Sequence, residues 1–71
     1  MPTYIVNRNA QSNGDYEVHD ETSGCRWLPA NSNRVSLGFF FGCSDAVSAA
    51  RAKGYSPANG CFFCARECHT G

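Results

Sequence analysis

The chain has 71 residues, with six basic and six acidic side chains and therefore no formal net charge. A zero balance argues against a nonspecific nucleic-acid binder, because affinity for phosphate comes from a cationic excess. Aromatic residues make up 13% of the chain, enough to anchor a core and to argue against intrinsic disorder. Residues 1–71 form one domain, whose core alone supplies only about 3–5 kcal/mol, so we expect an additional cross-link.

No apolar run approaches the ~18–20 residues that cross a bilayer, so we expect no membrane association. The start of the chain has neither a basic leader nor an apolar segment typical of a signal peptide. We therefore expect a cytoplasmic, reducing location. The five cysteines are odd in number, which rules out complete disulfide pairing within one chain. Clustered cysteines in a reducing compartment more often bind metal; free structural thiols and the disulfides of a secreted peptide are the alternatives.

The N-terminal part of the chain is typical of a β-hairpin. Tyrosine, isoleucine and valine predict a strand over residues 3–7, and alternating apolar residues predict a second strand over 15–19. The Asn13-Gly14 pair between them is a strong turn signal, because both residues tolerate positive φ. A short apolar stretch follows the second strand and cannot form a long helix, because Pro29 stops it.

The clearest strand signal covers residues 34–41. Apolar side chains alternate there with a period of two, which predicts one shared face for Val35, Leu37, Phe39 and Phe41. Phe40 then points the other way, either under a helix or into an exposed aromatic patch.

A helix is predicted over residues 45–53, with Ser44 as its N-cap and Gly54 as the C′ residue that ends it. Cys43, just before the helix, is expected to be a small buried apolar side chain. Residues 61–69 are expected to form a cysteine knuckle that runs into a short C-terminal helix.

The most specific motif is the pair Cys61-x2-Cys64, because two thiolates at this spacing can reach one ion from a tight turn. Tetrahedral coordination asks for two more ligands, and His19-x5-Cys25 supplies them. We therefore expect one structural zinc ion. Its binding free energy, about 10–16 kcal/mol for such sites, would exceed what this core can supply.

The fourth ligand has an alternative. Strand alternation places His19 opposite Val18, where the imidazole could face solvent. Cys68 would then replace it, because Cys64 and Cys68 lie four residues apart and share one helix face. Otherwise Cys68 and His69 are expected to be frayed or exposed. With the ion, the elements predict a small zinc-stapled α+β domain: a short antiparallel sheet (N-terminal hairpin plus one strand), one central helix and a short C-terminal helix.

Three segments carry a family resemblance: His-x5-Cys-Arg-Trp-Leu-Pro at residues 19–29, the cysteine-to-tyrosine run at 43–55, and Cys-x2-Cys at 61–64. Together they resemble the Ada-type metal-binding module. The resemblance covers residues 19–64 and implies a zinc-stapled α+β domain with the same four ligands, in a small stand-alone bacterial or phage protein. Alkylation-repair members accept a methyl group at a Cys-x3-Cys pair; this chain has none at Cys25, so that role does not carry over.

The composition favours a non-enzymatic, zinc-stabilised interaction module. An aromatic and basic surface could dock a partner, and its candidate residues are Arg26, Trp27, Phe40, Phe62, Phe63 and Arg66. A protein partner is favoured because the net charge is zero, with a single-stranded nucleic acid as the alternative. A metal-dependent hydrolase would need an open zinc position and a general base, for which Glu17 and Glu67 are candidates only by their position in the sequence.

Overall fold

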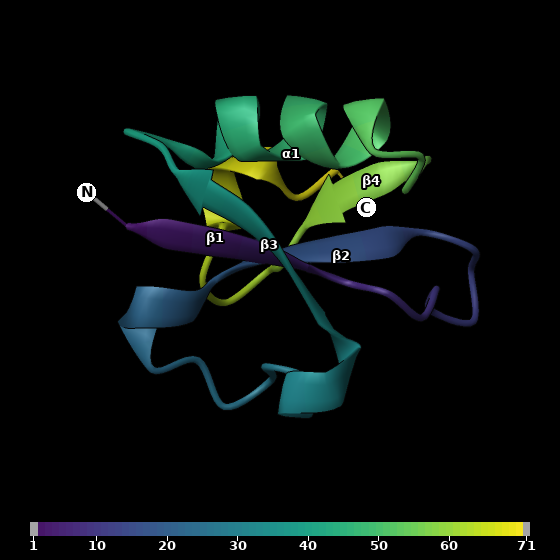
Figure 1. Cartoon of the computed structure of the whole chain (residues 1–71), viewed down its shortest axis with the longest axis horizontal. Helices are drawn as coiled ribbons and strands as arrows, with labels where there is room; N and C mark the ends of the chain where they lie inside the picture. The colour runs from purple at the N-terminus through teal and green to yellow at the C-terminus, as the bar shows by residue number, and fades with distance from the viewer. Residues whose placement is uncertain (1, 71) are drawn as a thin grey trace.

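A computed structural model describes residues 2–70 (Figure 1). Its regular elements are β1 (Thr3–Asn7), β2 (Tyr16–Asp20), β3 (Arg34–Phe39), α1 (Cys43–Ala52) and β4 (Ala58–Gly60), with short 3-10 turns at Glu21–Ser23, Asn31–Asn33 and Arg66–Cys68. The described residues thus form an α+β structure with one α-helix and one four-stranded sheet. No helix in this part of the chain has the length and apolar character needed to cross a membrane.

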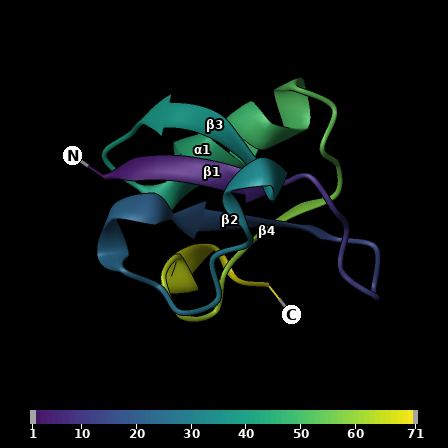
Figure 2. The same cartoon turned by 60° about the horizontal axis from the view of Figure 1, so that its bottom comes forward.

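The sheet has the strand order β3-β1-β2-β4 (Figure 2). β1 pairs antiparallel with β2 and with β3, whereas β4 pairs parallel with β2. The predicted antiparallel sheet of a hairpin plus one strand was therefore incomplete. β4 is the short sequence Ala-Asn-Gly, which carries no β-branched or aromatic signal. Its pairing is instead set by the way α1 returns the chain to the far edge of the sheet.

β3 contains an irregularity that changes which side chains face the core. Consecutive residues of β1 pair with Gly38 and Ser36, which leaves Leu37 as the extra residue of a β-bulge. Gly38 has a φ of 109°, a left-handed conformation that L side chains rarely adopt. The strand therefore bends at Gly38, and the alternation beyond it is reversed.

The predicted shared face of residues 35–41 was wrong beyond this bulge. Leu37 is buried, but Phe39 and Phe41 are 66% and 88% exposed. Phe40 packs instead against the core, with its ring centroid 6.3 Å from that of Tyr4. Period-two reasoning fails here because one inserted residue exchanges the two faces of a strand.

α1 lies on one face of the sheet (Figure 1). Its buried side chains follow the spacing i, i+3, i+4, i+7 of an amphipathic helix: Cys43, Ala46, Val47 and Ala50. They share the hydrophobic core with Tyr4, Val6, Val18 and Leu37 of the strands. The helix begins two residues before the predicted Asp45, with Gly42 rather than Ser44 at the N-cap position. The helix ends at Ala52, one residue before the predicted Lys53, and Gly54 follows the C-cap as predicted, with a φ of 98°.

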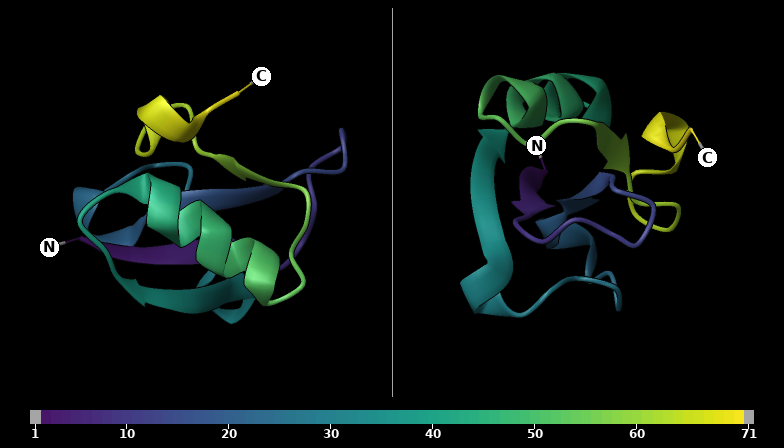
Figure 3. Two further views of the ribbon diagram at one scale, coloured as in Figure 1. Left: turned by 90° about the horizontal axis from the view of Figure 1, so that it is seen from above. Right: turned by 90° about the vertical axis from the view of Figure 1, so that its right-hand side faces the viewer.

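The opposite face of the sheet is covered without a helix. Ile5 and His19 are paired across β1 and β2 and are only 2% and 1% exposed. Neither side chain belongs to the face under α1, because Tyr4, Val6 and Val18 occupy that face. The long connection over residues 21–33 lies on this side of the sheet, and the C-terminal segment flanks β4 (Figure 3). The histidine is thus buried on the face away from the helix.

A disulfide joins Cys43, at the start of α1, to Cys68, with Cα atoms 6.2 Å apart. Cys43 is buried as expected, but it is not a free apolar side chain, and Cys68 is neither frayed nor available as a metal ligand. The predicted C-terminal helix is a single 3-10 turn, which holds Cys68 through an amide hydrogen bond of 3.0 Å to the carbonyl of Ala65. His69 is also held, with Nδ1 3.1 Å from the carbonyl oxygen of Gly60.

Candidate metal centre

Cys25 reaches the sheet because the chain reverses directly after β2. The carboxylate of Asp20 accepts the amide of Thr22 at 3.0 Å and so caps the 3-10 turn that follows. Gly24, in the left-handed conformation with φ 73°, ends this turn and redirects the chain. These two local features bring Cys25 back beside His19, although five residues separate them in the sequence.

Cys61 and Cys64 form a tight knuckle after β4. The amide of Cys61 donates to the carbonyl of Val18 at 2.8 Å, which continues the β2–β4 pairing and fixes Cys61 beside β2. The amide of Ala65 donates to the carbonyl of Cys61 at 2.9 Å and closes the turn. Backbone amides also point at sulfur: Phe63 N lies 3.4 Å from Sγ of Cys61. Such amides stabilise the negative charge of thiolates.

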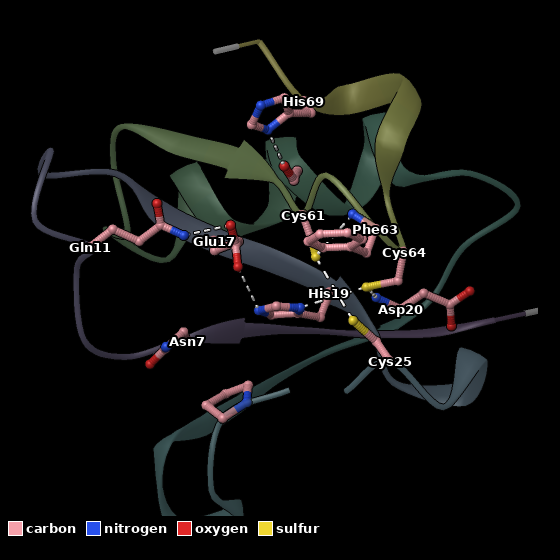
Figure 4. Close-up of polar contacts among 12 residues, drawn as sticks. Asn7, Gln11, Glu17, His19, Asp20, Cys25, Cys61, Phe63, Cys64 and His69 are labelled. Carbon is pink, nitrogen blue, oxygen red and sulfur yellow. Dashed lines mark hydrogen bonds and ion pairs between the residues drawn. The ribbon is translucent and has the colours of Figure 1, made fainter. Parts of the chain in front are cut away.

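The side chains of His19, Cys25, Cys61 and Cys64 converge on one point (Figure 4). Their ligand atoms all lie within 4.8 Å of one another. The two Sγ atoms of Cys25 and Cys61 are 3.9 Å apart, and Sγ of Cys64 lies 3.6 Å from Nδ1 of His19. The sulfur separation is too long for a disulfide, whose bond is about 2.0 Å.

These separations match the edges of a zinc tetrahedron. Zinc–sulfur bonds of about 2.3 Å and zinc–nitrogen bonds of about 2.0–2.1 Å, at tetrahedral angles, set S···S edges of about 3.8 Å and S···N edges of about 3.6 Å. The Cys25–Cys61 and Cys64–His19 separations are 3.9 Å and 3.6 Å, and no other edge exceeds 4.8 Å. Three sulfurs and one imidazole nitrogen are also donors that zinc prefers. The residues therefore fit a four-coordinate metal ion.

Burial favours the neutral forms of the histidine and of two of the thiols. Burial lowers the pKa of His19, the Glu17 carboxylate opposes this shift and Arg34 adds to it. The imidazole is therefore neutral near pH 7, which is the form that binds a metal. Burial raises the pKa of the thiols of Cys61 and Cys64. A divalent cation bound at this point would reverse that preference, because coordination deprotonates a thiol.

Glu17, which the sequence suggested only as a candidate general base of a hydrolase, contacts the cluster through His19. Its Oε1 lies 3.1 Å from Nε2 of His19, on the side of the ring away from the thiols. The signal in the sequence was the spacing i, i+2, which puts Glu17 and His19 on one face of β2. Glu67, the other acidic candidate, lies by the disulfide and lines a hollow with residues of α1.

Most of the predicted aromatic and basic residues lie next to this site. Trp27 and Phe63 are stacked, with ring centroids 5.5 Å apart and planes inclined by 22°, and Phe62 meets Phe63 edge-on. The guanidinium of Arg66 lies 5.1 Å from the centroid of Phe62. Trp27, Phe62 and Phe63 are 55%, 45% and 64% exposed. Phe40 belongs to the core instead and is not part of this surface.

A cleft of about 530 Å³ opens beside the cluster and is lined by Ser23, Cys25, Arg26, Trp27, Phe63 and Cys64. A smaller hollow of about 220 Å³ is also bordered by Trp27 and Phe63, together with Glu17 and Cys61. The stacked pair of rings thus borders both depressions. We call Arg26, Trp27, Phe62, Phe63 and Arg66 the aromatic surface.

Comparisons of the chain with protein-family models, with curated proteins and with solved structures gave no match. The Ada-type likeness stays a prediction from the motifs quoted above.

Proposed function

We propose that this chain is a non-enzymatic interaction module whose fold is fixed by one zinc ion bound to His19, Cys25, Cys61 and Cys64. The observation that carries the proposal is the convergence of four ligand atoms within 4.8 Å. When bound, the ion would supply a cross-link between the end of β2, the loop after it and the C-terminal knuckle. The proposal keeps the Ada-type likeness, including the stand-alone bacterial or phage origin that it implies.

The donor set favours a structural ion over a catalytic one. Structural zinc sites use four protein ligands, whereas catalytic sites keep one position open for water or substrate. Here the four ligands come from the protein, and the nearest carboxylate contacts the histidine rather than a free position. These features support a closed site and argue against the hydrolase alternative.

A protein is the proposed partner, and the aromatic surface is the proposed contact. Exposed aromatic rings and arginine are the residues enriched at protein interfaces. Only Arg26 and Arg66 bring positive charge there, whereas the smaller hollow is bordered by the carboxylate of Glu17. A backbone-tracking nucleic-acid groove needs a stronger positive charge than this.

Metal analysis of the purified protein tests the central proposal. We expect one zinc per chain and loss of the fold when a chelator removes it. Cobalt substitution should give the intense visible bands of a four-coordinate thiolate site. The variant Cys61→Ser should bind the metal weakly, whereas Ser48→Ala on the exposed side of α1 should bind it normally. A purified protein that contains no metal, is folded and keeps its fold in the presence of a chelator would overturn the proposal.

The partner class has its own test. Titration of labelled single-stranded DNA and RNA at low salt should give no binding. Oligonucleotide binding that weakens steeply with salt, and that Trp27→Ala abolishes, would favour the nucleic-acid alternative over a protein partner.

The cytoplasmic location also stays a prediction. Metal-bound thiolates suit a reducing compartment, whereas a disulfide such as Cys43–Cys68 is typical of an oxidising one. Alkylation of thiols in intact cells before lysis decides between them: a bridged Cys43–Cys68 pair in those cells would contradict a reducing location.

A further inference from the structure

Glu17 contacts the metal cluster without belonging to the four ligands. Its side chain and that of His19 extend from the same face of β2, two residues apart. Oε1 of Glu17 lies 3.1 Å from Nε2 of His19, and the two side chains are 20% and 1% exposed. The carboxylate–imidazole contact is therefore largely buried.

Glu17 is itself held in place. Its second carboxylate oxygen, Oε2, accepts a hydrogen bond from Nε2 of Gln11. The backbone amide of Gln11 donates to the carbonyl of Asp15 at 2.8 Å, which fixes Gln11 within the hairpin loop. The close-up shows dashed contacts from Gln11 to Glu17 and from Glu17 to His19, with the thiols on the other side of the imidazole (Figure 4).

We propose that Glu17 is a positioning residue that holds His19 with a proton on Nε2 and thereby assigns Nδ1 as the metal-binding atom. This inference rests on the proposed function, because it concerns the same metal site.

The argument follows from the chemistry of the two side chains. An ionised carboxylate only accepts hydrogen bonds, so the ring nitrogen that faces it must carry the hydrogen. In a neutral imidazole the other nitrogen then has a free lone pair. That nitrogen is Nδ1, which lies 3.6 Å from Sγ of Cys64. If the imidazole rotated by 180° about its Cβ–Cγ bond, Nε2 would lose its contact with the Glu17 carboxylate, and His19 is only 1% exposed.

The expected energetic consequence is a change in metal affinity. Carboxylate partners of metal-bound histidines fix the ring and raise its basicity, and their removal commonly weakens metal binding about 10–100-fold. Glutamine at position 17 can still accept the hydrogen bond through its amide oxygen but carries no charge. The conservative variant should therefore retain more affinity than alanine.

The first experiment reads the histidine directly. Long-range proton–nitrogen NMR spectra of the zinc-loaded, uniformly nitrogen-15-labelled protein distinguish a protonated, a free and a metal-bound ring nitrogen. We expect the metal-bound signal at Nδ1 and the protonated signal at Nε2 of His19. A metal-bound Nε2 would overturn the inference while leaving the zinc module intact, whereas a protein without zinc would overturn the proposed function first.

The second experiment compares zinc affinities by competition with a coloured chelator. Glu17→Ala should weaken binding about 10–100-fold, and Glu17→Gln by clearly less. Glu21→Gln is the matched control, because its carboxylate pairs with Arg34 at 3.2 Å and not with the histidine. Equal affinities for Glu17→Ala and the unmodified chain, with the cobalt spectrum unchanged, would contradict the positioning role. If Glu17→Ala does not fold, the NMR assignment in the unmodified chain still decides.

Discussion

Gly60 and Cys68 lie so close together that a Cβ at Gly60 would meet Cβ of Cys68 at 2.7 Å. The same Cβ would lie 2.6 Å from the carbonyl oxygen of Ala65. Real Cβ contacts are not this short, and backbone atoms cannot move aside as a flexible side chain can. Position 60, immediately before Cys61, requires glycine because the C-terminal 3-10 turn approaches β4 so closely.

Gly60→Ala should therefore destabilise the protein by about 1–3 kcal/mol, the usual cost of overpacking. Denaturant unfolding measures this loss. Gly42→Ala is the control, because a Cβ there meets no atom within 4 Å. Its cost should stay below about 1 kcal/mol, as for a weakened helix N-cap. Equal stability of the two variants would mean that the C-terminal turn does not pack on Gly60.

The disulfide gives a second prediction. The double variant Cys43→Ala/Cys68→Ala should lose about 3–4 kcal/mol, because the bridge closes a loop of 25 residues. It should still bind one metal ion, since neither cysteine belongs to the cluster. Denaturant unfolding and metal analysis test both parts. Thiol titration of the denatured, metal-free protein should find three thiols before reduction and five after it; five at the outset would refute the bridge.

Two neighbouring phenylalanines provide a matched comparison of burial. Phe40 packs on the core beside Tyr4, whereas Phe41 is 88% exposed. Phe40→Ala should lower the free energy of unfolding by about 2 kcal/mol, which is less than the loss for a fully buried phenylalanine. Phe41→Ala should change it by no more than about 0.5 kcal/mol. Thermal unfolding of the two variants is sufficient. The opposite order would show that the bulge at Gly38 does not exchange the faces of β3.

Trp27 should report on the proposed metal site, because it is the single tryptophan of the chain. It follows Cys25 by two residues and stacks on Phe63, which precedes Cys64. Removal of the ion should free both loops and separate the rings, so the emission of Trp27 should move to longer wavelength and its near-ultraviolet circular dichroism should fall. Zinc should restore both signals. A tryptophan spectrum that is insensitive to chelation would mean that the stack does not depend on the ion.

The raised pKa of Tyr4 should be visible in an alkaline titration. Burial, and after it the charge of Asp20, raises the pKa of Tyr4 above its ordinary value of 10.0. The folded state favours the neutral phenol, so this contribution to stability is complete below the ordinary pKa and disappears as pH rises through the raised value. Titration of tyrosinate absorbance should contain a late component that belongs to Tyr4. Tyr4→Phe should remove that component, and Tyr16→Phe should leave it.

Local sequence signals predicted the local elements of the fold. The strand at residues 3–7 and the glycine that ends α1 follow from residue type and short-range spacing, and both are confirmed. The parallel pairing of β4 was missed, because Ala-Asn-Gly gains its strand conformation only from contact with β2. The faces of β3 were assigned wrongly because a bulge depends on pairing with β1, which period-two alternation does not reveal.

In the candidate site too, some features follow from local sequence and others from tertiary contacts. Cysteine and histidine spacing selected the four residues that the fold brings together. The same reasoning kept Cys68 as an alternative ligand, because a cysteine four residues after Cys64 satisfies helical spacing. The chain there is one 3-10 turn, and Cys68 faces the start of α1. Which cysteines pair and which remain thiols is decided by tertiary approach, so spacing alone could not separate them.

The short stretch from Cys61 to Cys68 is thus secured at one end by the thiol cluster and at the other by a covalent bridge to α1. In the proposed zinc form, a chelator would act on the first attachment and leave the sulfur–sulfur bond intact, whereas a reductant would act on the second. A chain unfolded by chelation alone would therefore keep the covalent loop between Cys43 and Cys68. Only chelation together with reduction would give an unfolded chain without cross-links.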